Sequence, residues 1–260
     1  MLKGLYATYT GMMNQQNRMD VLTNNLANVN TNGYKKEGAT SQSFNAMYAH
    51  KINDKSINGR LTHYLGRNNP GVKIGEGYTD FSQGSMRATD NPYDLALTDR
   101  GFFAIEYTNK SGETSTKYTR DGNFTLNQNG ELVTQDGDFV LNLGGQRINI
   151  NPFIQDTVID VNGNIFQNGL VIDRIQIADF EDYNYLRQFG ENLFEAVEGA
   201  EEIESPARIY AGYLEMSNVS VVSEMVNMIT VQRAYDANQK VMTTLDGSLD
   251  IAANQLGRLG

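Results

Sequence analysis

The chain has 260 residues, which is enough for one large domain or two smaller ones. Its formal net charge of −10 argues against nucleic acid or an anionic membrane surface as the main partner. It contains no cysteine, so disulfides, thiolate metal sites and cysteine catalysis are excluded. No run of about 18 apolar residues is present, so we expect no membrane insertion. The first residues also lack the pattern of a secretory signal peptide.

Residues 1–34 are predicted to form an N-terminal helical segment, with the helix itself running to about residue 31. Apolar residues recur every seven positions, and others widen the stripe at helical offsets. The helix is expected to end near Gly33, because glycine readily takes the left-handed conformation that follows many helices. The heptad row is Leu5, Met12, Met19 and Leu26, and Leu2, Tyr9, Leu22 and Val29 lie beside it.

The middle of the chain is predicted to be β structure. Residues 35–75 have few strong patterns and are interpreted as an extended connector. From 76 to 210, short apolar runs with a period near two alternate with dipeptides that suit tight hairpins. The runs are 102–105, 124–126, 139–141 and 158–161, and the dipeptides are Asp121-Gly122, Asn129-Gly130, Asp136-Gly137, Asn162-Gly163 and Asn168-Gly169.

Residues 211–260 hold the second helical segment, with a helix expected from about 218 to 257. Two apolar rows with seven-residue spacing run along it. Glu224 and Asn238 interrupt the second row, and polar residues at such positions cost stability but can fix register and partner choice. One row is Val221, Met228, Tyr235, Met242, Leu249 and Leu256, and the other includes Val231, Leu245, Ala252 and Leu259.

These patterns predict an α+β fold class: long N- and C-terminal helices that pair as a coiled-coil-like bundle, and a central all-β domain of the antiparallel, barrel- or sandwich-like type. Gly4, Gly11 and Gly247 weaken the helices by about 1 kcal/mol each. One helix paired with one other covers only a single face, so we predict that the ends are largely disordered in a monomer and fold on assembly. The alternative is a two-helix pair docked on the sheet of its own subunit.

No catalytic residue, cofactor or metal ion is predicted. Asp121 and Asn123 alternate as in a calcium loop, but Leu126 stands where that loop needs glycine. His50 and His63 have no metal-ligand spacing, and neither a Gly-x-Ser-x-Gly nor a His-Glu-x-x-His motif is present. A pair of carboxylates of the glycosidase type stays open, because nothing in the sequence singles out two of the many acidic residues.

The segment from Leu22 to Lys35 resembles the N-terminal signature of bacterial flagellar rod and hook proteins. That signature is an asparagine-rich helix end followed by a threonine, a small residue, an aromatic and a basic residue. Thr98-Asp99-Arg100 departs from the small or glycine-containing pair that the family more often carries there. Further resemblances lie at 83–84, 94–97, 101–103 and 118–124 in the middle and at 214–219, 224–229 and 232–240 near the end.

The resemblance implies a non-enzymatic subunit of the basal-body rod, which crosses the periplasm and joins rotor to hook. It implies copies of the chain and other rod or hook proteins as partners, and export through the flagellar type III apparatus without a cleaved signal. A hook-type protein, a rod-capping or assembly factor and a cell-wall hydrolase are the alternatives. The expected assembly interface is Leu5, Met12, Met19, Leu22, Leu26, Asn24, Asn25, Asn28, Thr31, Gly33, Tyr34, Val221, Met228, Val231, Tyr235, Asn238, Met242, Leu245, Leu249 and Leu256.

Overall fold

The computed structural model describes residues 2–45, 47–51, 63–69, 71–154, 157–190 and 192–256. The chain divides into two compact units. The first unit comprises Met1–Leu26, Glu37–Asp80 and Ser220–Gly260. The second comprises Ala27–Lys36 and Phe81–Val219. Both ends of the chain therefore belong to the first unit, and the β-rich middle forms the second.

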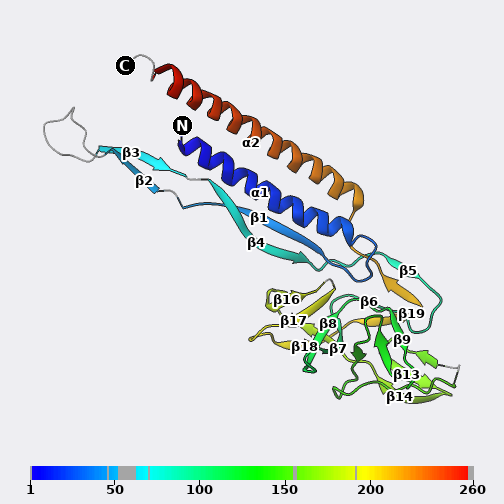
Figure 1. Ribbon diagram of the computed structural model, residues 1–260. Helices are drawn as coiled ribbons and strands as arrows, with labels where there is room; N and C mark the ends of the chain where they lie inside the picture. Colours follow the sequence, from blue (N-terminus) through cyan, green and yellow to red (C-terminus); the bar gives the residue numbers. More distant parts are fainter. Residues whose placement is uncertain are drawn as a thin grey trace. The chain divides into compact units, whose positions relative to one another are not determined.

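Two long helices dominate the first unit, which confirms the prediction of terminal helices (Figure 1). Helix α1 spans Leu2–Ala27 and helix α2 spans Val221–Leu256. They lie side by side in opposite directions, because Gly4 of α1 faces Leu245 of α2 and Gly11 faces Asn238. In the described residues, no helix is long and apolar enough to span a bilayer.

Helix α1 ends at Ala27 rather than near residue 31. Asn28 explains the early end, because its backbone carbonyl accepts from the amide of Thr31 (3.3 Å) and its side-chain oxygen accepts from the Thr31 hydroxyl (3.1 Å). Such local bonds compete with helix continuation. Gly33 follows with a φ of 66°, the left-handed conformation predicted for it.

Four strands complete the first unit. Strand β1 (Lys36–Ser43) pairs with β4 (Val72–Asp80), and β2 (Met47–Lys51) pairs antiparallel with β3 (His63–Asn68). The stretch interpreted as an extended connector thus contains two paired sets of strands. His50 and His63 lie in β2 and β3, and their side chains are outside the described part of the structure.

The second unit is built around a nine-stranded sheet. Its main path is β16-β17-β8-β7-β11-β10-β9, and β15 pairs with both β7 and β18. Neighbouring strands in this sheet are antiparallel, as predicted, and the path of the described strands does not close into a barrel. The strands are β7 (Phe102–Thr108), β8 (Thr114–Thr119), β9 (Phe124–Leu126), β10 (Leu132–Thr134), β11 (Phe139–Val140), β15 (Ile177–Phe180), β16 (Leu186–Phe189), β17 (Leu193–Ala196) and β18 (Glu202–Glu204), with a short 3-10 helix η1 (Tyr183–Tyr185) before β16.

Three smaller sheets accompany it. One has the order β12-β13-β14, and the other two pair β19 with β6 and β20 with β5. All of them are antiparallel. Their strands are β12 (Thr157–Ile159), β13 (Asn164–Gln167), β14 (Leu170–Arg174), β6 (Leu95–Thr98), β19 (Arg208–Ala211), β5 (Met86–Ala88) and β20 (Tyr213–Glu215).

The predicted turns are confirmed at some positions and wrong at one. Asn168 and Gly169 both have positive φ, at 51° and 77°, and form the tight hairpin between β13 and β14. Gly122 does not have a positive φ. A side chain there would lie 1.6 Å from the carbonyl oxygen of Leu95, so this glycine is needed for close backbone approach and not for a hairpin.

The second unit has its own hydrophobic core, in two clusters. The larger one packs side chains from β7, β9, β10 and β11 of the large sheet with those of the smaller sheets, and the smaller one is rich in aromatic rings. The larger cluster is Leu95, Leu97, Phe103, Ile105, Phe124, Leu132, Val140, Ile148, Ile150, Ile159, Ile165, Ile175 and Ile209, and the smaller is Phe102, Ala104, Tyr118, Leu141, Ala178, Phe180 and Phe194.

Candidate assembly surfaces and a buried ionic clasp

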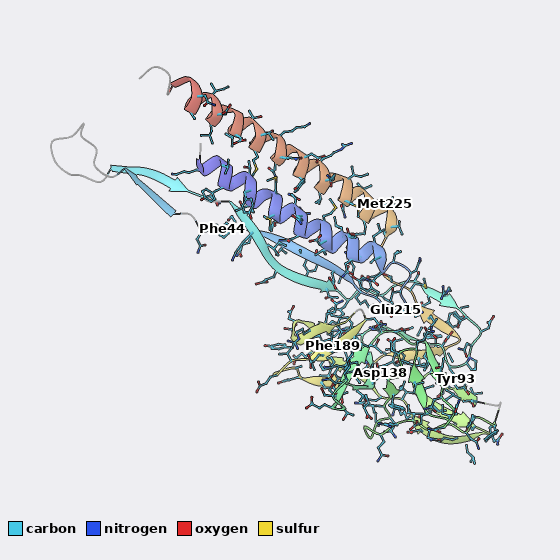
Figure 2. All side chains as sticks on the ribbon, viewed as in Figure 1. Phe44, Tyr93, Asp138, Phe189, Glu215 and Met225 are labelled. Carbon is cyan, nitrogen blue, oxygen red and sulfur yellow. The ribbon has the colours of Figure 1, made fainter. Side chains whose placement is uncertain are left out.

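Three buried charged side chains meet in the second unit, and we call them the clasp: Lys35, Arg120 and Glu215 (Figure 2 labels Glu215). Lys35 Nζ lies 2.7 Å from Glu215 Oε1, and Arg120 Nη1 lies 3.2 Å from Glu215 Oε2. Each side chain is at most 3% exposed. Burying an ion costs several kcal/mol unless a partner and further hydrogen bonds compensate it, so this arrangement depends on all three members.

The clasp is completed by backbone groups. The amide of Gly84 donates to Glu215 Oε1 (2.9 Å), and Lys35 Nζ donates to the carbonyl of Ser82 (2.9 Å). Arg120 Nη2 donates to the carbonyl of Asp99 (2.5 Å). The Glu215 carboxylate therefore accepts hydrogen bonds from two cations and one amide. A buried carboxylate needs such hydrogen-bond donors to compensate the loss of water.

The same bonds join the two segments that lead into the helices. The amide of Gly33 donates to the backbone carbonyl of Glu215 (2.8 Å), and the amide of Lys36 donates to Asn218 Oδ1 (2.7 Å). Asn218 Nδ2 in turn donates to the carbonyl of Ser82 (3.1 Å). Residues 33–36 follow α1 in the chain and 215–218 precede α2, so these two segments are bonded to each other within the second unit.

The predicted apolar rows of α1 and α2 lie within the first unit. Val231 is 3% exposed and Val221 is 37% exposed. The side chain of Leu256 and the whole of Leu259 lie outside the described part. The remaining row residues are partly buried: Leu5, Met12, Met19, Leu22, Leu26, Met228, Tyr235, Met242, Leu245 and Leu249.

Glycines of α1 set the distance between the helices. A Cβ added at Gly4 would lie 3.3 Å from Leu245 Cδ1, and one added at Gly11 would lie 3.1 Å from Asn238 Nδ2. Asn238, which interrupts the apolar row of α2, is therefore accommodated beside a residue without a side chain. The sequence identified these glycines only as weak points of the helix, whereas in the structure they allow α2 to approach closely.

Two of the predicted asparagines, Asn25 and Asn28, form hydrogen bonds within the chain. Asn25 is fully buried, donates to the carbonyl of Glu37 (2.8 Å) and accepts from its amide (2.9 Å), which attaches β1 to α1. Asn28 stabilises the turn after α1 through Thr31. Tyr34 is buried in the second unit, and Asn24 is exposed. Helix termination therefore accounts for part of this asparagine-rich run.

Sequence reasoning missed the outer apolar stripe of α2 and, apart from Tyr9, that of α1. Val222, Met225, Val226 and Ile229 of α2 are between 49% and 73% exposed, and Figure 2 labels Met225 on this helix. Their spacing of i, i+3, i+4 and i+7 is that of a helix face that docks on another element. Tyr6, Tyr9 and Met13 form a shorter exposed stripe on α1. The spacing is visible in the sequence, but the longer heptad rows drew the interpretation away from it.

One carboxyl group of the second unit has an unusual pKa. Burial raises the pKa of Asp121 to about 6, and the nearby charges of Asp136 and Asp94 act in the same direction. Hydrogen bonds from the Asn123 amide and Asn192 Nδ2 oppose the shift. In the described residues, no three histidine or acidic side chains are grouped as metal ligands.

Comparison with known proteins gives the family. Residues 5–35 match the description "Flagella basal body rod protein", 96–167 match "Flagellar hook protein FlgE/F/G D1 domain", and 210–256 match "Flagellar basal body rod FlgEFG protein C-terminal". The rod protein FlgG of Buchnera aphidicola subsp. Baizongia pistaciae is 33% identical over 96% of this chain and 98% of its own. The chain belongs to the flagellar basal-body rod protein family.

Other relatives of the rod family align over nearly the full length. The hook-basal body complex protein FlhO of Bacillus subtilis is 32% identical over 100% of both chains. The rod protein FlgF of Caulobacter vibrioides is 32% identical over 98% of this chain and 97% of its own. Each of the three regions matched to the rod family contributes one clasp residue: Lys35, Arg120 and Glu215. The clasp is thus where the three parts of the family pattern meet in space.

Proposed function

We propose that this chain is a structural, non-enzymatic subunit of the flagellar basal-body rod that assembles with copies of itself and with other axial proteins. Membership of the rod protein family over the full chain supports this function. The proposal includes export through the flagellar type III apparatus and a position in the periplasm-spanning rod, where the subunit transmits torque from rotor to hook.

The structural observation that carries the proposal is the outer apolar stripe of α2. A helix of a self-sufficient globular domain carries its polar residues on the face opposite the core. Here Val222, Met225, Val226 and Ile229 occupy that outer face, while the other side of α2 packs against α1. Association with a neighbouring helix would remove these side chains from water, at about 25 cal/mol per Å² of apolar surface buried.

In this proposal, the heptad rows predicted as the interface act within the subunit, where they hold the two helices together. Leu245 lies opposite Gly4 of α1, Asn238 lies opposite Gly11, and Tyr235 borders one pocket with Met19, so this side of α2 packs against α1 and makes the pair a defined element. The pair then docks on neighbouring subunits through its outer stripes. Both sets of residues contribute to assembly. The heptad rows form the helix pair, and the outer stripes make the direct contacts with neighbouring subunits. Paired helices of successive chains would form the coiled-coil-like inner layer.

The clasp gives the proposed subunit a mechanical link. Lys35 and Glu215 stand next to the segments that lead into α1 and α2, and both are tied to the β-rich unit by short buried bonds. A force that arrives along the chain at Lys35 or Glu215 would be spread over several charge-assisted hydrogen bonds within the second unit. Bonds of this kind are about twice as strong as neutral ones.

The proposal predicts that Met225→Asp combined with Val226→Asp abolishes swimming while the purified chain keeps its β-sheet circular dichroism. Two carboxylates on the outer stripe would have to be buried at each contact. The matched control is Gln239→Asp, which adds a charge to an exposed polar position of the same helix and should leave swimming intact. Met242→Asp and Leu249→Asp on the heptad rows should also stop swimming, because they break the helix pair.

Isolated hook–basal bodies decide between the proposal and its rivals. The wild-type chain should be retained in them through detergent and alkali washes, as detected by mass spectrometry. Absence of the wild-type chain from these particles would exclude a rod subunit and favour a transient assembly factor. A peptidoglycan zymogram of the purified chain should show no clearing, and clearing would instead support a hydrolase.

A further inference from the structure

Strand β14 is an edge strand with an unusual surface. It pairs with β13 on one side and ends the order β12-β13-β14. Its first three residues, Leu170, Val171 and Ile172, are 72%, 59% and 45% exposed. Three consecutive exposed apolar residues on a sheet edge are a template for pairing with another strand, and proteins that stay monomeric protect such edges with charges, prolines or bulges.

The charges that follow in β14 do not protect this edge. Asp173 Oδ2 accepts from Asn142 Nδ2 (3.0 Å), and Arg174 Nε donates to the carbonyl of Asn162 (3.2 Å). Both side chains are thus engaged within their own unit. The register between β13 and β14 shifts at Ile172, whereas Leu170 and Val171 pair regularly with Gln167 and Phe166. This regular part of the edge carries neither a bulge nor a charged side chain that would protect it.

The opposite edge of the same sheet is also apolar. Strand β12 lies there, and its central residue Val158 is 57% exposed. It borders a groove of about 360 Å³ whose walls include Ala88, Pro92 and Tyr213. One sheet therefore presents an apolar strand at one edge and an apolar strand beside a groove at the other.

The register across the sheet links the two edges. Val158 pairs with Phe166 of β13, and Phe166 pairs with Val171 of β14. The three side chains form one cross-strand row, the unit of stabilisation within a sheet. A strand added at either edge would continue this row if Val171 of one chain lay opposite Val158 of the next.

We propose that β14 of one subunit adds to the β12 edge of a second copy of this chain, so that the three-stranded sheets continue from subunit to subunit. This inference rests on the proposed rod function, which places copies next to one another. The two edges differ, so the contact is heterologous and does not close, as a growing rod requires. Main-chain hydrogen bonds provide affinity, and the apolar row fixes the register.

Cysteine cross-linking tests the proposal directly, because the natural chain has no cysteine. The test variant carries Val158→Cys and Val171→Cys together. Within one chain these positions are separated by β13, at about 9–10 Å, which is too far for a disulfide. Hook–basal bodies isolated from cells that express this variant are oxidised with copper phenanthroline and separated by non-reducing electrophoresis.

We expect a ladder of dimers, trimers and larger species, since each chain would be linked at both edges. Either single variant alone should give no linked species. Dimers from Val171→Cys alone would show two β14 edges meeting and would overturn the proposal. Monomer only from the double variant, with the chain present in the particles, would also overturn it while leaving the rod function intact. Absence of the chain from the particles would instead count against the rod function itself.

A second variant tests the apolar edge without relying on a cysteine pair. Ile172→Lys, added to the double cysteine variant, should reduce the ladder at least about tenfold, because a lysine on an edge strand blocks further pairing. The matched control is Val197→Lys, at an exposed apolar residue outside β14, and it should leave the ladder unchanged. Equal ladders in both lysine variants would contradict the proposed contact.

Discussion

The two units of this chain are stabilised in different ways. The second unit has two clusters of buried side chains, with Phe102, Phe103 and Phe124 fully enclosed. In the first unit, Val231 of α2 is the one apolar side chain among those described that is fully buried. Its other buried side chains are polar: Asn14, Asn25 and Glu224. The β-rich unit therefore has a core of its own, whereas the helical unit has little more than one shared face.

This difference indicates which part of the subunit is complete before assembly. Burial of apolar surface is the main favourable term in folding, and conformational entropy opposes it along every ordered residue. The second unit meets this requirement within one chain. The first unit leaves Val222, Val226 and Ile229 in water, so we infer that it reaches full stability only when neighbouring chains cover them.

Hydrogen exchange on the monomeric chain gives the largest expected contrast. Amides of β7 and β8 in the second unit should exchange only through global unfolding, whose free energy is about 5 kcal/mol or more. Amides within 5–26 and 221–256 should exchange orders of magnitude faster. Mass spectrometry of peptic peptides measures both in one experiment, and equal protection of helices and sheet would show that the first unit needs no neighbour.

Glu215→Ala tests whether the clasp holds the second unit together. The substitution leaves Lys35 and Arg120 buried without a carboxylate, which should lower the free energy of unfolding by about 3–5 kcal/mol. Urea denaturation followed by circular dichroism measures the change. Glu106→Ala is the control, since Glu106 pairs with the more exposed Arg147 and should cost no more than about 1 kcal/mol. Similar costs for the two variants would mean that the clasp is not a stabilising element.

The sequence predicted the helices and strands better than the contacts between residues that are far apart in the chain. Heptad spacing identified both helices, and the period of two identified β7 and β9, because these patterns depend only on neighbours in the chain. The clasp could not be derived in this way. Lys35, Arg120 and Glu215 are far apart in the sequence, and ordinary charged residues give no local sign that they will be buried together.

The same reasoning explains why the outer apolar stripes were not identified from the sequence. A heptad row and a stripe of i, i+3, i+4 and i+7 spacing both predict an apolar face, and the sequence alone does not say which face the chain itself covers. Gly4 and Gly11 decide it, because they allow Leu245 and Asn238 to come close and so direct the heptad rows inward. The outer stripe is identified only after the inner contact is known.

Gly33→Ala should have the next largest effect. Gly33 has a φ of 66°, and a Cβ there would lie 2.4 Å from the backbone of Arg120. Strain and overlap together should lower the free energy of unfolding by about 2–3 kcal/mol. Gly169→Ala separates the two causes, because Gly169 also has a positive φ but has nothing within 4 Å of its Cβ position. It should cost only about 1 kcal/mol, and equal costs would mean that Gly33 is constrained by its backbone conformation alone.

Asp121→Asn should have the smallest effect, and its sign is opposite. The pKa of Asp121 is raised from 3.8 to about 6, so the folded state binds this proton more tightly than the unfolded chain. Stability contributed by the protonated group is complete below about pH 4 and is lost as the pH rises through 6.

An asparagine does not ionise, and Asn192 can turn its amide so that its oxygen accepts from the new side chain. A shift of this size corresponds to roughly 3 kcal/mol, and the amide that replaces the carboxyl group recovers only part of it. The variant should therefore be more stable by about 1–2 kcal/mol at pH 8 and no more stable than the parent at pH 4. Thermal unfolding across this range measures the difference, and a gain independent of pH would show that charge at Asp121 is not its cause. A gain confined to neutral and alkaline pH would show that even the self-sufficient unit retains one acidic group at a cost to its stability.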